Sequence, residues 1–157
     1  MIEFARRMLP YDRWANARVL AALEGWPEAK GRALERFAHI LFAQEVWLLR
    51  INGQDTSSHT TPWPAYSVQD CRNKFTVLGR AWEAYLAAVT PSESERVFDY
   101  KTTQGKPSKA RVGDVLVHVF NHGTYHRGQI ATALKEAGID PPVTDYIAYA
   151  MEIEKKR

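Results

Sequence analysis

The 157-residue sequence has a single cysteine, Cys71, so it cannot form an internal disulfide bond. It also lacks an uninterrupted apolar run of about 18 residues, the length that a membrane-spanning helix needs. The opening segment, Met1 to Pro10, includes a glutamate and has no apolar stretch of signal-peptide length. We therefore expect a cytoplasmic protein without a membrane partner, in which Cys71 is a half-buried, unreactive side chain.

Several common catalytic motifs are missing as well. The sequence has no glycine-rich phosphate loop, no His-Glu-x-x-His pattern and no Gly-x-Ser-x-Gly nucleophile elbow. The net charge is only +3, and the one basic cluster, from Lys101 to Arg111, is interrupted by Gly105 and Pro107. A solvated loop explains this cluster better than a nucleic-acid site, which needs a basic stripe or interleaved aromatic residues. No nucleic-acid partner is expected.

The composition is that of an ordinary globular domain. Hydrophobic residues make up 45% of the chain and charged residues 25%. A chain of this length is able to bury a sizeable core. No repeat, low-complexity tract or linker divides it, so we expect a single domain over residues 1–157.

Apolar residues at helical spacing predict four long amphipathic helices and one short one. The predicted spans are residues 4–24, about 28–51, 67–89, 111–137 and 144–155. Ser67, with Asp70 three residues later, is the predicted N-cap of the third helix, and Gly138 ends the fourth. The expected buried face of the first helix consists of Leu9, Trp14, Ala17, Leu20, Ala21 and Leu23.

The connections between these helices contain one irregular feature. Segment 96–110 alternates polar and apolar residues around Gln104-Gly105, which predicts a small hairpin. Four long helices with modest connections favour an all-α four-helix bundle, in which this short hairpin precedes the last long helix. Bundles of this kind commonly hold metal ions between side chains of facing helices.

Three of the five histidines, His118, His122 and His126, follow one another at four-residue intervals on one predicted helix. Residues four apart lie on the same helix face, so two such imidazoles can bind one metal ion. The helix rises about 6 Å over four residues, whereas metal–nitrogen bonds are about 2.0–2.1 Å long, so the outer pair cannot share an ion. Spacing alone leaves His118/His122 and His122/His126 as equal alternatives.

A metal site needs at least one further ligand from elsewhere in the chain. His39 lies on the flank of an amphipathic helix, beside Phe42 and Val46, where it can point towards the bundle interior. His59 lies in a polar stretch that ends in Pro62, which is typical of a loop. We therefore predict that His39 is the third ligand and that His59 is solvated.

Several segments together resemble the DinB-like (DinB/YfiT-like) family of proposed metalloenzymes. They are the helix from His39 to Gly53, the His-x-x-x-His-Arg-Gly-Gln motif of residues 122–129, the segment 11–16 and the segment 138–146. The resemblance covers nearly the whole chain and implies the same four-helix architecture. It also implies that the metal ligands are His39, His122 and His126, with a fourth position open to water. His118 then lies next to the site or in the core.

The resemblance implies a metal-dependent enzyme with a divalent ion, of which zinc and nickel are favoured. Some DinB-like proteins are thiol-dependent transferases or isomerases, so the favoured activity is a thiol S-transferase that uses a small-molecule substrate and a low-molecular-weight thiol. The alternatives are a metal-dependent hydrolase and a non-catalytic metal-binding module of the stress response. A homodimer is expected, chiefly from the resemblance.

Arg127 directly follows the last proposed ligand. Its guanidinium is suited to binding an anionic substrate group through two hydrogen bonds. An interhelical salt bridge is the alternative role, and the sequence leaves the two open. Gln129 is a candidate for orienting either a side chain or the backbone, while Gly123 and Gly128 indicate close helix packing or space for a ligand.

Overall fold

The structure is a computed structural model that describes residues 1–26 and 31–155. The long helices are α1 (Ile2–Glu24), α2 (Arg32–Ile51), α3 (Val68–Ala88) and α4 (Val112–Glu136), and a short helix, α5 (Tyr146–Glu154), follows them. A 3-10 helix, η1 (Pro91–Glu95), and two strands, β1 (Val97–Lys101) and β2 (Pro107–Arg111), lie between α3 and α4. The start of the predicted second helix, at residues 28–30, falls outside the described residues.

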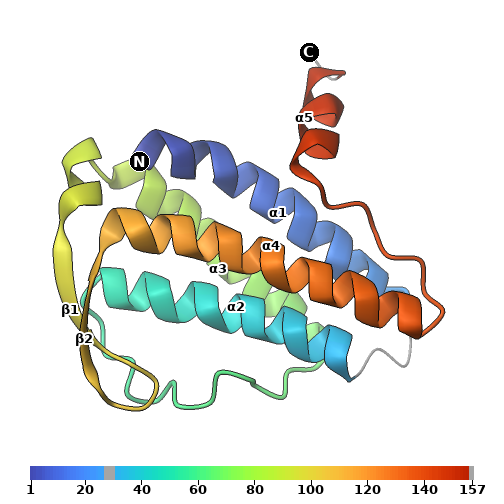
Figure 1. Cartoon of the computed structure of the whole chain (residues 1–157), viewed down its shortest axis with the longest axis horizontal. Coiled ribbons are helices and arrows are strands. Elements are labelled where there is room, and N and C mark those ends of the chain that lie inside the picture. Colours follow the sequence, from blue (N-terminus) through green and yellow to red (C-terminus); the bar gives the residue numbers. More distant parts are fainter. Residues whose placement is uncertain (27–30, 156–157) are drawn as a thin grey trace.

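The four long helices run alongside one another as a bundle, with the hairpin at one end (Figure 1). Strands β1 and β2 pair antiparallel, with Phe98 opposite Ala110. Helix α5 projects away from the bundle (Figure 1), and its Tyr146 and Tyr149 rings contact Tyr11 of α1. The predicted all-α bundle with a hairpin before the last long helix is confirmed. None of the helices in the described ranges is long and apolar enough to cross a membrane.

Local signals fix the ends of α3 and α4. The Ser67 hydroxyl accepts a hydrogen bond from the Asp70 amide, and the Asp70 carboxylate accepts one from the Ser67 amide, which together form a capping box. After α4, Gly138 adopts a φ of +77°, a conformation that glycine tolerates because it has no Cβ. The amide of Ile139 then donates to the Leu134 carbonyl and closes the helix.

Two apolar clusters form the core, one near the hairpin and one near the opposite end of the bundle. The first includes Trp82 and Phe98, and the second includes Phe37, Cys71 and Ile130. Burial, with a smaller effect of Asp70, raises the pKa of the Cys71 thiol to about 12. The prediction of an unreactive cysteine is therefore confirmed, and its burial is complete rather than partial.

The buried face of α1 differs from the predicted one. Leu9, Leu20 and Leu23 are buried as expected, but Ala17 and Ala21 are exposed. Trp14, the remaining predicted member, is half-buried. The buried face instead includes two polar residues, Asp12 and Asn16, which are 2% and 1% exposed. Polar groups this deep in a protein need partners, because an unpaired buried charge is costly.

Arg127 of α4 is the partner of these polar residues. Its Nη1 donates to Oδ1 of Asp12 at 2.6 Å and to Oδ1 of Asn16 at 2.9 Å. Gln44 of α2 donates to the other Asp12 oxygen at 2.7 Å. The guanidinium also donates to the Thr124 hydroxyl at 3.0 Å. One buried network thus connects α1, α2 and α4.

Of the two roles left open for Arg127, the structure shows the interhelical salt bridge, and the substrate contact stays a prediction. The residue is only 2% exposed, and its charge is neutralised by Asp12. Gly123 makes room for this pair, because a Cβ at that position would lie 2.9 Å from Oδ1 of Asp12 and 3.0 Å from Nη1 of Arg127. The space beside Gly123 is therefore occupied by the ion pair itself.

Replacing Arg127 with methionine will leave the Asp12 carboxylate buried without its cation. We expect Arg127→Met to lower the free energy of unfolding by about 3–5 kcal/mol. Arg18→Met is the matched control, because Arg18 makes an exposed ion pair with Glu152 at 2.8 Å and its loss costs about 0–1 kcal/mol. Chemical denaturation of both variants measures the difference, and equal losses would contradict the assigned role.

Candidate metal centre

Helices α2 and α4 bring three of the histidines together. Nε2 of His122 lies 3.1 Å from Nε2 of His39 and 3.1 Å from Nε2 of His126. The three potential ligand atoms all lie within 4.8 Å of one another. His39 comes from α2, whereas His122 and His126 are one turn apart on the facing surface of α4. The trio named from the sequence is therefore assembled as a group.

Hydrogen bonds fix the orientation of two of these rings. Nδ1 of His39 lies 2.6 Å from the carbonyl oxygen of Pro62, and Nδ1 of His126 lies 2.8 Å from Oε1 of Gln129. Both partners are acceptors, so each Nδ1 carries the proton and each Nε2 presents a lone pair. Gln129 is thus an orienting residue, one of the roles considered for it from the sequence.

The protonation of the trio favours cation binding. Burial, with smaller effects of the neighbouring His126, His39 and His118 rings, lowers the pKa of His122 to about 3. Burial is also the main cause that lowers the pKa of His39 and of His126, and Arg36 adds to the effect on both. The imidazoles are therefore neutral near pH 7, the state in which they bind metals.

These nitrogens have the chemistry of a metal site. Two Nε2 lone pairs face the same His122 nitrogen, and a single proton on that nitrogen satisfies only one of them. A divalent ion satisfies all three, and nitrogen atoms bound to one ion at about 2.0–2.1 Å lie roughly 3 Å apart. The group is therefore compatible with metal binding. Within the described residues it includes no carboxylate or thiol, so three ligands leave a coordination position open.

Aromatic and cationic residues cover one side of the trio. Trp63 stacks on His39 with ring centroids 3.9 Å apart, and the guanidinium carbon of Arg36 lies over the Trp63 ring, 4.6 Å from the ring centroid. Trp63 is 43% exposed, so it forms an outer wall rather than a core contact. The loop between α2 and α3 thus supplies both the Pro62 carbonyl and this wall.

The two remaining histidines lie outside the ligand group. His118 is exposed, and its ring is 5.2 Å from His122 and 5.5 Å from Trp47, measured between centroids. It is therefore a neighbour of the site, which agrees with one of the two roles expected for it. His59 lies in the loop as predicted, but it is half-buried, with its Nε2 4.0 Å from a Glu45 carboxylate oxygen.

A four-helix bundle with three histidine nitrogens converging between α2 and α4 defines a helical protein with a candidate metal centre. The chain belongs to the DinB family, whose model matches residues 1–156. It is similar to protein DinB of Bacillus subtilis (strain 168), with 25% identity over 95% of this chain and 95% of that protein. The crystal structure of a DinB-like protein from Bacillus cereus ATCC 10987 shares the fold, with a TM-score of 0.64, 20% identity and coverage of 90% of this chain and 95% of that one.

Sequence reasoning did not identify several residues that hold the site. Pro62 and Trp63 reach His39 through a loop 23 residues further along the chain, and no local pattern predicts that contact. The burial of Asp12 and Asn16 could have been predicted from their spacing, because they lie one helical turn apart on the same side of α1 as Leu9 and Leu20. A buried face that is chosen from apolar residues alone leaves out these two polar residues.

The trio links the stability of the metal-free protein to pH. The folded state lowers the pKa of His122 to about 3, whereas an unfolded chain keeps it near 6.5. Between these two pH values the unfolded state binds more protons than the folded state. The contribution of neutral His122 to the free energy of unfolding is therefore fully present above about pH 6.5 and is lost as the pH falls towards 3. We expect the melting temperature to drop on acidification and expect His122→Gln to weaken that dependence.

Circular dichroism melts of metal-free protein between about pH 7 and about pH 4 measure this effect. His59→Gln is the control, because it removes a titratable ring outside the trio. The same pH dependence in wild type and His122→Gln would contradict the assigned pKa shift.

Proposed function

We propose that this protein is a metal-dependent enzyme that transfers a low-molecular-weight thiol to an electrophilic small molecule. The observation that supports the proposal is the convergence of three neutral imidazoles, with one coordination position left for a ligand from solution. His39, His122 and His126 would hold the ion, and zinc or nickel fits their nitrogen-only donor set. When bound, such an ion acts as a Lewis acid and lowers the pKa of a thiol or water beside it.

The chain itself supplies no competing thiol nucleophile. Its one thiol, Cys71, is fully buried and its pKa is raised to about 12 by burial. Any thiol that takes part in the reaction must therefore come from outside the protein. The cytoplasm is the proposed compartment, because low-molecular-weight thiols are kept reduced there.

Residues around the trio have defined tasks in this proposal. The Pro62 carbonyl and Gln129 hold the protons of His39 and His126 on Nδ1, so the Nε2 lone pairs stay available. Trp63 limits the access of water along one side of His39. Arg127 acts at a distance from the reaction, since its ion pair with Asp12 fixes α4 against α1.

The reaction is tested with monochlorobimane, a fluorogenic electrophile. The thiol sulfur forms a bond to the bimane methylene carbon, the carbon–chlorine bond breaks, chloride leaves and the thiol proton passes to solvent. We expect turnover with one of glutathione, cysteine or coenzyme A, its loss after chelation, and its recovery with zinc or nickel. His126→Ala should reduce the rate to the uncatalysed level, while His59→Ala should retain turnover.

Two outcomes would overturn the transferase proposal. Metal-dependent cleavage of an ester without any thiol would indicate a hydrolase instead. Metal-loaded protein that catalyses neither reaction would indicate a non-catalytic metal-binding module, for which a stress-response role is the proposal. The homodimer stays a prediction, to be tested by sedimentation.

A further inference from the structure

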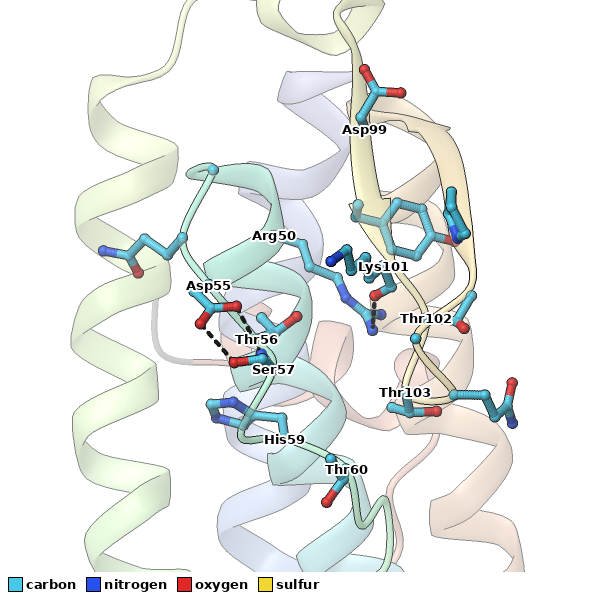
Figure 2. Close-up of a pocket in the computed structure, with 16 residues that line it drawn as sticks. Arg50, Asp55, Thr56, Ser57, His59, Thr60, Asp99, Lys101, Thr102 and Thr103 are labelled. Atoms are coloured by element: carbon cyan, nitrogen blue, oxygen red, sulfur yellow. Dashed lines mark hydrogen bonds between the residues drawn. The ribbon is translucent and has the colours of Figure 1, made fainter.

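A cavity lies between the loop after α2 and the tip of the hairpin (Figure 2). Its volume is about 840 Å³, which is in the range of small-molecule sites. Residues 53–57, 59 and 60 form one wall, and residues 99–105 and 107 form the other. Arg50, near the end of α2, lies between the two walls, and its side chain extends towards the hairpin (Figure 2). The cavity includes none of His39, His122 and His126.

Arg50 is a buried cation without a carboxylate partner among the described residues. It is 7% exposed, and its one hydrogen bond runs from Nη2 to the Lys101 carbonyl oxygen at 2.8 Å. Nε is enclosed by protein and has no partner. Nη1 also makes no hydrogen bond to the described residues, but it is not enclosed. Burial lowers the pKa of Arg50, which reflects the same shortage of stabilising groups.

The acidic residues in the cavity wall are already engaged. The Asp55 carboxylate accepts hydrogen bonds from the Ser57 amide at 2.9 Å and from the Ser57 hydroxyl at 2.7 Å. Asp99 is strongly exposed and pairs with Lys109 at 3.4 Å. Neither neutralises Arg50, so the cavity contains a positive charge that a ligand from solution is able to neutralise.

The surroundings of Arg50 select the kind of anion. Its guanidinium carbon lies 4.9 Å from the Trp47 ring centroid and 4.7 Å from the Tyr100 ring centroid. The two rings fix the plane of the guanidinium, and Nη1, which makes no hydrogen bond to the described residues, is left for a carboxylate oxygen. A single buried guanidinium matches one carboxylate charge, and the Tyr100 ring in the cavity wall offers apolar surface to a carbon skeleton.

We propose that this cavity binds a small organic carboxylate, whose carboxylate group pairs with Arg50 and whose carbon skeleton packs against Tyr100. Lys101 also lines the cavity. The site is separate from the histidine trio and does not depend on the proposed reaction. It gives Arg50 a role beyond anchoring β1 to α2 through the Lys101 carbonyl.

Succinate is the probe, titrated calorimetrically into metal-free protein, and its neutral diamide is the ligand control. We expect saturable binding of succinate and no binding of the diamide. Arg50→Met should weaken succinate binding by about tenfold or more, since a hydrogen-bonded charge is lost. Lys106→Met is the matched control, because it removes a hairpin cation that does not line the cavity, and its affinity should stay within about twofold of wild type.

A second variant keeps the test valid if Arg50→Met disturbs the hairpin. Thr56→Trp fills the cavity from the opposite wall without touching the contacts of Arg50, and it should abolish succinate binding while the circular dichroism melt remains that of wild type. Absence of saturable binding to wild type, or equal affinity in wild type and Arg50→Met, would overturn the proposal. So would loss of binding in His39→Ala, which would place the carboxylate at the histidine trio.

Discussion

The buried ion pair between Arg127 and Asp12 is the interaction on which the arrangement of the bundle depends. It lies one residue after His126, and its network reaches α1 through Asp12 and α2 through Gln44. Both Asp12 oxygens and both Nη atoms of Arg127 have hydrogen-bond partners, whereas the buried Nε of Arg127 has none among the described residues. The pair is costly to bury unless it keeps these partners, so it specifies how the three helices lie against one another. Gly123 belongs to the same constraint, since a side chain there would collide with the pair. The position of the histidines on α4 is a consequence of this packing.

The histidine trio differs from this ion pair because its polar atoms do not neutralise one another. Its nitrogens are close together and have two fixed lone pairs, yet the protein provides no acid within the group to share a proton with them. Hydrogen bonds thus hold the His39 and His126 rings in place, whereas the Nε2 lone pairs that face His122 have no cation between them among the described residues. The Arg50 cavity has the reverse imbalance, a buried cation without an anion. We propose that a ligand from solution, rather than the fold, satisfies each of them.

The parts of the fold that depend on residues close together in the sequence could be predicted. Ser67 with Asp70 and the glycine at 138 determine helix ends within a few residues, and both predictions are confirmed. The grouping of His39 with His122 and His126 required the family resemblance, since spacing alone left two pairs open. The role of Arg127 was not resolved, because its partner Asp12 is 115 residues away in the sequence. The contact of Pro62 with His39 and the cavity at Arg50 likewise depend on how loops fold back onto α2, which no periodic pattern encodes.

The most direct test of the central claim is the metal content of purified, untagged protein, measured beside His39→Ala. His39 is the decisive position, because it is the one ligand that α2 contributes and its loss leaves the α4 pair intact. We expect about one divalent ion per wild-type chain, with zinc or nickel the expected metal, and its loss in the variant under the same dialysis. A wild-type protein that contains no metal and resists reconstitution, or a variant that retains the ion fully, would contradict it.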